Sequence, residues 1–243
     1  FGARFELAVG AADGPPPSGA AVGAESWRRR REELTDVIIP HQFGGLPPAH
    51  AGVDVIRRAA GAVREWPGTR YHTYEVRTRF SGGGAVSLTL SLWIPRGNRP
   101  FPVILDADGC WRYFNDDVIA KVVQRGNIAA SVDRTEAAAD NKDVYRGTGL
   151  FRLFPDAEFG ALAAWAWAIH RCVDALETLD DVKADAIAVT GHSRGGKTVL
   201  LAGAMDERIA VTNPNHSGIG GAGLNGLKMS GSERIDSRSE ERR

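Results

Sequence analysis

The sequence predicts an α/β fold, a three-layer α/β/α sandwich with a mostly parallel sheet. Two observations favour it. Two alternating segments are followed by the order strand–helix–strand–helix–strand–helix–strand. The segments IAAS and IAVT are apolar without alternation, as expected for parallel strands that are buried on both faces. A chain of 243 residues has room for one ordinary domain built in this way.

The expected elements can be placed in order along the chain. Residues 71–80 and 85–94 alternate between apolar and polar side chains and are joined by SGGG, so they predict a hairpin. Before them, residues 27–37 have the pattern of a short helix, and residues 41–50 that of a Gly- and Pro-rich loop. After the hairpin we expect short strands over 102–109, 127–134, 186–190 and 209–212, and helices over 115–125, 158–179 and 194–204.

The two ends of the chain differ in composition from the middle. Residues 1–24 are rich in Gly, Ala and Pro and predict a flexible lead-in. Residues 230–243 are nearly all charged or small. Such a segment buries too little surface to offset the entropy of ordering it, so it predicts a disordered tail. The predicted domain therefore covers residues 25–229.

Charge and composition exclude several classes of function. Thirty Lys and Arg balance thirty Asp and Glu, which removes the electrostatic basis of nucleic-acid binding. No apolar run reaches the roughly 18 residues of a membrane span. Cys110 and Cys172 leave one disulfide or two free thiols open, and no cluster of Cys and His has the spacing of a zinc site. We expect neither nucleic acid nor a membrane among the partners.

The most informative segment is Gly191-His192-Ser193-Arg194-Gly195, which we call the serine turn. It has the pattern G-x-S-x-G, directly after an expected buried strand and directly before an expected helix. A serine in so tight a turn needs a strained backbone, and glycines on both sides let the strand and the helix approach it. Its hydroxyl is then exposed, while N–H groups at the helix start can stabilise an oxyanion. The spacing predicts a nucleophilic serine at position 193.

A phosphate-binding loop is the main alternative for this segment. Residues 191–198, GHSRGGKT, also fit the pattern G-x-x-x-x-G-K-[ST] letter by letter. Against a nucleotide site, no apolar strand that ends in a magnesium-binding Asp follows it. The segment also comes after about the fifth expected strand, late in the chain, whereas such loops usually follow the first strand. We therefore favour the nucleophilic serine.

The serine turn and its surroundings resemble the bacterial glucuronoyl esterases, carbohydrate esterase family 15, which have the α/β-hydrolase fold. The resemblance extends over residues 32–223. It rests on the Trp-Ala-Trp helix together with GHSRGGK, on the loop FGGLPP and on the strand FPVILDADGCW. It implies a serine hydrolase that cleaves esters of glucuronic acid through an acyl-enzyme, such as the esters that join glucuronoxylan to lignin alcohols.

Three residues take roles from this resemblance. Ser193 would attack the ester carbonyl, Arg194 would stabilise the oxyanion with its backbone N–H and its guanidinium, and Lys197 would hydrogen-bond the hydroxyls of the uronic acid. The ordinary alternative for Arg194 and Lys197 is a pair of cations at the start of a helix that point into solvent. The resemblance implies no metal and no organic cofactor. Family members that degrade plant cell walls are exported, which implies a secreted or periplasmic protein.

A serine nucleophile also needs a base and an orienting acid. One family position for the acid, just before the S-G-x-G-G run, holds His216 here. The family histidine would lie beyond Arg243. His216 is either the base itself or, in the interpretation that we favour, a loop histidine or a supporting one. We therefore expect a chain that lacks its C-terminal part, including the last strands of the fold, and that is inactive alone.

Two other functions fit the same residues. A generic carboxylesterase or an acetyl xylan esterase would share the serine turn but would not need Lys197. A non-catalytic relative would bind uronic acids without forming an acyl-enzyme. A sugar platform made of Trp165 and Trp167 is not expected, because residues two apart on a helix face different ways.

Overall fold

The computed structural model describes residues 23–223. The chain divides into two compact units, Phe1–Ile38 and Ile39–Arg243. In the first unit the described residues form helix α1 (Ala24–Ile38), none of whose side chains is buried. The helix expected over 27–37 is confirmed and begins at Ala24. The predicted tail over 230–243 and the lead-in up to residue 22 lie outside the described residues, and the domain limits at 24 and 229 stay predictions.

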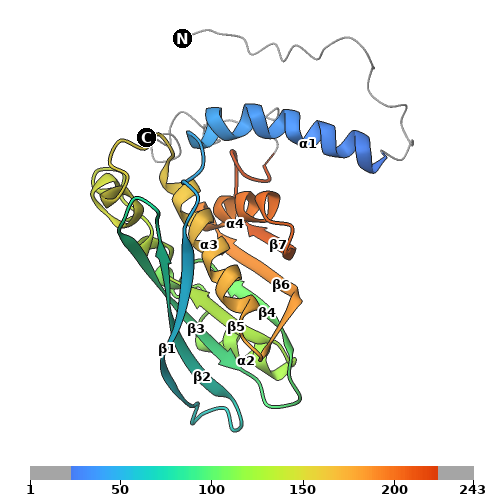
Figure 1. The fold of residues 1–243 in the computed structure, drawn as a ribbon. Helices are drawn as coiled ribbons and strands as arrows, with labels where there is room; N and C mark the ends of the chain where they lie inside the picture. The colour runs from blue at the N-terminus through green and yellow to red at the C-terminus, as the bar shows by residue number, and fades with distance from the viewer. Residues whose placement is uncertain (1–22, 224–243) are drawn as a thin grey trace. The chain divides into compact units, whose positions relative to one another are not determined.

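The second unit is built on a sheet of seven strands in the order β1-β2-β3-β5-β4-β6-β7 (Figure 1). The strands are β1 (Gly52–Ala62), β2 (Arg70–Arg79), β3 (Ala85–Ile94), β4 (Phe101–Asp106), β5 (Ile128–Val132), β6 (Val182–His192) and β7 (Ile209–Asn215). The α-helices of this unit are α2 (Asp116–Gln124), α3 (Ala161–Glu177) and α4 (Arg194–Met205). Short helical turns are η1 (Ile39–Phe43), η2 (Gly109–Trp111), η3 (Arg134–Glu136), η4 (Tyr145–Gly147) and η5 (Gly149–Arg152).

Each strand and helix expected from residue 71 onward is present, with ends that differ by a few residues. The predicted hairpin is confirmed, since β2 pairs with β3 from Arg70–Ile94 to Arg79–Ala85. The loop expected over 41–50 begins instead within the π-helical turn η1. Strand β1 was not expected, because it reads GVDVIRRAAGA, without regular alternation, and its second half is exposed at the sheet edge.

Half of the sheet is antiparallel, so the expectation of a mostly parallel sheet is wrong. Strands β5, β4, β6 and β7 pair in parallel. Strands β1, β2, β3 and β5 pair antiparallel. The sheet is therefore mixed, and β1 at the edge extends the antiparallel half. The carboxyl ends of the parallel strands meet at one edge, which is where ligands bind in open α/β sheets.

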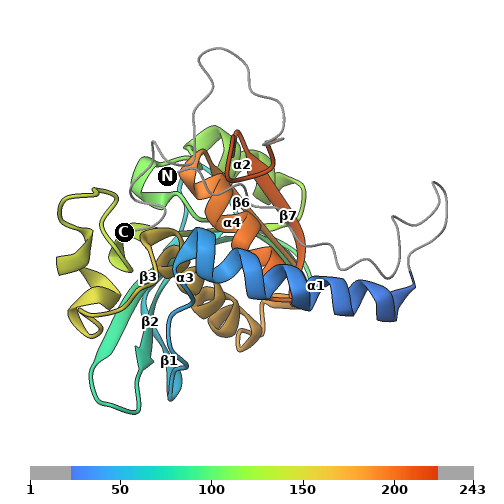
Figure 2. The ribbon, with the colours of Figure 1, turned by 90° about the horizontal axis from the view of Figure 1, so that it is seen from above.

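Helices cover both faces of this sheet, which confirms the three-layer arrangement (Figures 1 and 2). Successive residues of β4 point to opposite faces: Val103 and Leu105 join the large core under α3 and α4, whereas Ile104 packs in a smaller core under α2. Trp165 and Trp167 of α3 are 0% and 4% exposed, so both side chains pack in the large core and do not form a sugar platform at the surface.

Cys110 and Cys172 are free thiols, so of the two alternatives the disulfide is wrong. Among residues 23–223, none of the helices has the length and apolar character that a membrane crossing requires. In the same part of the chain, no group of three or more His, Cys, Asp or Glu side chains could hold a metal ion.

Candidate active site

The serine turn lies between the end of β6 and the start of α4, and its backbone is strained. Ser193 has φ 54° and ψ −112°, a conformation that residues other than glycine rarely adopt. A Cβ on Gly191 would lie 2.5 Å from the carbonyl oxygen of Gly195, and a Cβ on Gly195 would lie 2.1 Å from Asp108 Oδ2. Gly191 is therefore needed for the strand and the helix to come so close, as the sequence predicts, whereas Gly195 leaves room for the Asp108 side chain.

Neighbouring backbone fixes Ser193 at the carboxyl edge of the sheet. Its N–H donates to the carbonyl oxygen of Asn215, the last residue of β7, at 2.9 Å. Its own carbonyl oxygen accepts the N–H of Lys197 at 3.1 Å, the first hydrogen bond of α4. Ser193 is half-buried, so the turn presents it at the surface between two adjacent parallel strands.

The turn does not have the form of a phosphate-binding loop. Arg194, Gly195, Gly196 and Lys197 already belong to α4, and Ser193 alone separates this helix from β6. A phosphate-binding loop needs a run of irregular backbone whose N–H groups surround the anion. No such run is present between these two elements, which favours the nucleophilic serine.

Arg194 and Lys197 lie on the first turn of α4, and neither points freely into solvent. Lys197 is 4% exposed, so the solvent-facing alternative is wrong for this residue. The Arg194 side chain is 26% exposed, and its Nη1 lies 2.7 Å from Asp140 Oδ1 in an ion pair. The structure therefore brings the three predicted residues together at one helix start, and their roles in a reaction stay predictions.

A set of buried charged residues under the serine turn was missed by the sequence analysis. It consists of Asp108, Arg134 and Asp140, whose side chains are 2%, 2% and 6% exposed. Arg134 Nε donates to Asp108 Oδ1 at 2.8 Å, and Arg134 Nη2 donates to Asp140 Oδ2 at 2.9 Å. Their positions in the sequence give only a weak signal, since Asp108 and Arg134 each follow an apolar strand that ends at this edge of the sheet.

His216 directly follows β7. It is exposed, with φ 49°, and its ring centroid is 5.3 Å from that of His192. The His192 ring stacks in turn on Tyr113, 5.7 Å away, and the Tyr113 hydroxyl accepts a hydrogen bond from Asn215 Nδ2. His216 and Ser193 thus follow neighbouring positions on adjacent strands, and the choice between a base and a supporting histidine stays open.

Asp106, at the end of β4, is fully buried below this site. Burial raises the pKa of its carboxyl from the ordinary 3.8 to about 7. The backbone N–H groups of Asp108 and Phe114, which donate to it, act against this shift, and the nearby Asp108 charge adds to it. The folded state therefore binds a proton at a pH where the unfolded state has lost it.

We expect this carboxyl to make the protein less stable as the pH rises from 4 to 7. A raised pKa stabilises the fold at low pH, and the contribution, on the order of 4 kcal/mol, disappears as Asp106 ionises in the folded state. Urea unfolding at several pH values measures it. In Asp106→Asn, which cannot titrate, this part of the decline should be absent. Parallel stability profiles for the two proteins would contradict the assignment.

Known proteins resemble this chain both in sequence and in structure. A family model described as "Glucuronyl esterase, fungi" matches residues 78–241. The 4-O-methyl-glucuronoyl methylesterase 1 of Wolfiporia cocos is 32% identical over 206 residues, which are 83% of this chain and 47% of that protein. The corresponding enzyme of Schizophyllum commune is 30% identical over 206 residues, 82% of this chain and 47% of that protein. The chain spans about half the length of these curated relatives.

Solved structures show the same fold. A CE15 glucuronoyl esterase from Teredinibacter turnerae superposes with a TM-score of 0.72 at 26% identity, over 84% of this chain and 55% of that one. A glucuronoyl esterase from Solibacter usitatus superposes with a TM-score of 0.70 at 25% identity, over 83% and 61%. The family model and these curated relatives are fungal, whereas the two structures are bacterial, so the resemblance to the bacterial members in particular stays a prediction. With the serine turn in place on an α/β-hydrolase sheet, the chain belongs to the glucuronoyl esterases, carbohydrate esterase family 15.

Proposed function

We propose that this chain carries the nucleophile and the oxyanion-stabilising cation of a serine esterase that cleaves esters of glucuronic acid. The observation that carries the proposal is the strained Ser193 between β6 and α4, with Arg194 held beside it by an ion pair. The names of the curated relatives, 4-O-methyl-glucuronoyl methylesterases, support a uronic acid ester as the substrate. Because the chain spans about half the length of those relatives, the activity is proposed for the whole natural protein.

The reaction follows the acyl-enzyme route. Ser193 Oγ attacks the ester carbonyl carbon while its proton passes to a histidine base, and the carbonyl oxygen becomes an oxyanion. The Arg194 backbone N–H, at the start of α4, and the Arg194 guanidinium stabilise that charge. The bond to the alcohol oxygen then breaks, and the alcohol leaves with the proton from the base. Water attacks the acyl-enzyme in the same way, which releases the glucuronic acid and restores Ser193.

The remaining predicted residues have supporting roles in this proposal. Lys197, buried on the same turn of α4, hydrogen-bonds the hydroxyls of the uronic acid. His216 is the candidate for the base among the described residues, because it follows the residue that accepts the Ser193 N–H. The natural substrate that we infer is the ester between a glucuronoxylan side chain and a lignin alcohol. The route requires neither a metal nor an organic cofactor.

The proposal is tested by hydrolysis of a methyl or benzyl ester of glucuronic acid by the whole natural protein. We expect turnover that falls by at least about 10³-fold in Ser193→Ala, since removal of a serine nucleophile leaves only the contribution of binding and of the oxyanion site. Ser87→Ala is the matched control. Ser87 is an exposed serine of β3 that donates to Glu75, away from the turn, so its loss should leave turnover unchanged.

The same assay separates the alternatives. Hydrolysis of 4-nitrophenyl acetate or acetylated xylan with no turnover of the glucuronate ester would instead indicate a generic carboxylesterase or an acetyl xylan esterase. Binding of glucuronate with no hydrolysis of any ester would indicate the non-catalytic relative. Equal turnover in the wild type and Ser193→Ala would remove Ser193 from the reaction.

A further inference from the structure

The guanidinium of Arg194 is held by a residue far from it in the sequence. Arg194 Nη1 lies 2.7 Å from Asp140 Oδ1, and Asp140 is 6% exposed. Asp140 belongs to the segment between β5 and α3, which follows β5 at the carboxyl edge of the sheet. An arginine on the first turn of a helix has a long, flexible side chain, which in solvent would adopt many rotamers. The ion pair restricts it to one side of the serine turn.

Asp140 is itself part of a chain of buried charges that returns to the turn. Arg134 bridges Asp140 and Asp108, at 2.9 and 2.8 Å. The other oxygen of Asp108, Oδ2, accepts the backbone N–H of His192 at 2.6 Å. His192 and Arg194 are the two neighbours of Ser193. The chain of contacts therefore reaches the nucleophile position from both sides, through the backbone on one side and through a side chain on the other.

Arg134, in the middle of this series of buried charges, is anchored in the large core. The Arg134 guanidinium carbon lies 4.0 Å from the centre of the Trp165 ring, which is fully buried. Trp165 Nε1 donates to the carbonyl oxygen of Ala138 at 2.7 Å, and the N–H of Ala139 donates to Thr148 Oγ1 at 2.8 Å. The backbone that leads to Asp140 is therefore fixed at two successive residues. Two guanidinium groups also balance the two carboxylates Asp108 and Asp140, so neither carboxylate is left without a cation.

We propose that Asp140 is a positioning residue for the ester hydrolysis, which fixes the Arg194 guanidinium before the oxyanion forms. This rests on the proposed function, in which Arg194 stabilises that charge. A cation that is already in place needs no reorganisation when the negative charge develops, whereas a free arginine must first leave solvent and lose rotamers. Asp140 acts through Arg194 and does not contact the substrate, so its loss should affect the transition state more than substrate binding.

The experiment is a double-mutant cycle on the whole natural protein, with a glucuronate ester as the substrate. Asp140→Asn keeps the size of the side chain and removes its charge. We expect kcat to fall by about 10- to 100-fold, less than or equal to the loss of one oxyanion donor, with KM changed by no more than about twofold. In an Arg194→Ala background the same substitution should have almost no further effect, because the residue that it positions is already absent.

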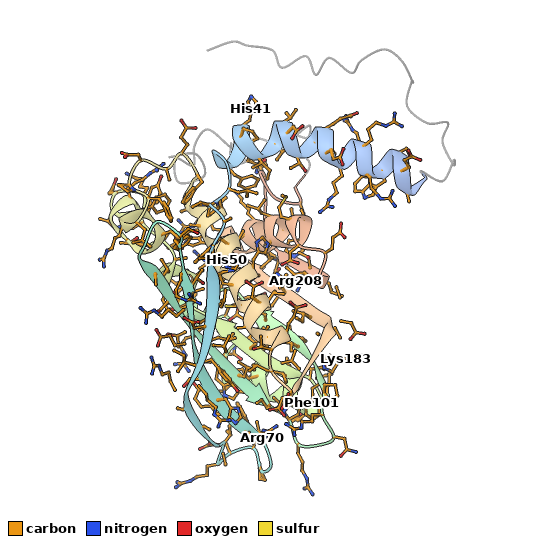
Figure 3. All side chains as sticks on the ribbon, viewed as in Figure 1. His41, His50, Arg70, Phe101, Lys183 and Arg208 are labelled. Carbon is orange, nitrogen blue, oxygen red and sulfur yellow. The ribbon has the colours of Figure 1, made fainter. Side chains whose placement is uncertain are left out.

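Asp181→Asn is the matched control. Asp181 is also a mostly buried carboxylate that accepts two hydrogen bonds from an arginine, Arg70. It directly precedes β6, at the end opposite to the serine turn, where Arg70 and Phe101 lie together (Figure 3). Loss of a structural ion pair alone should lower the thermal midpoint in both variants but leave kcat unchanged in Asp181→Asn.

The outcomes distinguish this inference from the proposed function. If Arg194→Ala leaves kcat unchanged, the role of Arg194 in the proposed function is wrong. If Arg194→Ala lowers kcat while Asp140→Asn does not, or if the two losses multiply, only the positioning role is overturned. Asp140→Glu keeps the charge and should retain more kcat than Asp140→Asn at a similar thermal midpoint. If neither Asp140 variant folds, the residue is required for structure and the positioning role is likewise overturned.

Discussion

Gly195→Ala is expected to lower the free energy of unfolding by about 3 kcal/mol and to remove most of the proposed esterase activity. Its Cβ would lie 2.1 and 2.3 Å from the two carboxylate oxygens of Asp108. Asp108 cannot move aside easily, because it accepts hydrogen bonds from the His192 N–H and from Arg134. Relief of the clash therefore breaks either the backbone of the serine turn or the buried charges below it. Urea unfolding and ester hydrolysis measure the two effects.

Gly147→Ala provides the control for this substitution. A Cβ on Gly147 would meet no atom within 4 Å, and its backbone has no positive φ. We expect a change of no more than about 0.5 kcal/mol and normal activity. Equal stability of the two variants would show that Asp108 can shift without cost, and that its close approach to α4 does not constrain the turn.

The serine turn could be predicted from the sequence because its determinants are local. Gly191, Ser193 and Gly195 lie within five residues, and an apolar strand and a helical pattern on either side identify the turn between them. The strained φ of Ser193 follows from the same few residues. Helix and strand positions from residue 71 onward were predictable for a similar reason, since each depends on periodicity within a short window.

The buried charges could not be predicted because their contacts are not local. Arg134 is 26 residues from Asp108, and His192 is 84 residues from it. They meet only when β4, β5 and β6 stand next to one another in the sheet. In the sequence alone, Asp108 and Arg134 are polar residues near the end of a strand, where a solvated loop usually begins. Strand β1 was not predicted for a different reason. An edge strand that is half exposed needs no apolar alternation.

Replacement of Arg134 by methionine is expected to be the most damaging change to stability in this network. Methionine keeps a similar length and can still pack against Trp165, but it leaves Asp108 Oδ1 and Asp140 Oδ2 without the cation that both contact. Removal of one partner of a buried ion pair leaves an uncompensated charge, which costs about 3–5 kcal/mol. Urea unfolding of Arg134→Met against the wild type near pH 7 measures this loss.

An exposed ion pair provides the control that identifies the cause of that loss. Arg70→Met removes an arginine that is 44% exposed and pairs with Asp181, so it should cost no more than about 1 kcal/mol. A loss in Arg134→Met no larger than that in Arg70→Met would instead show that Asp108 and Asp140 do not need this cation, which would leave its packing on Trp165 as the role of Arg134.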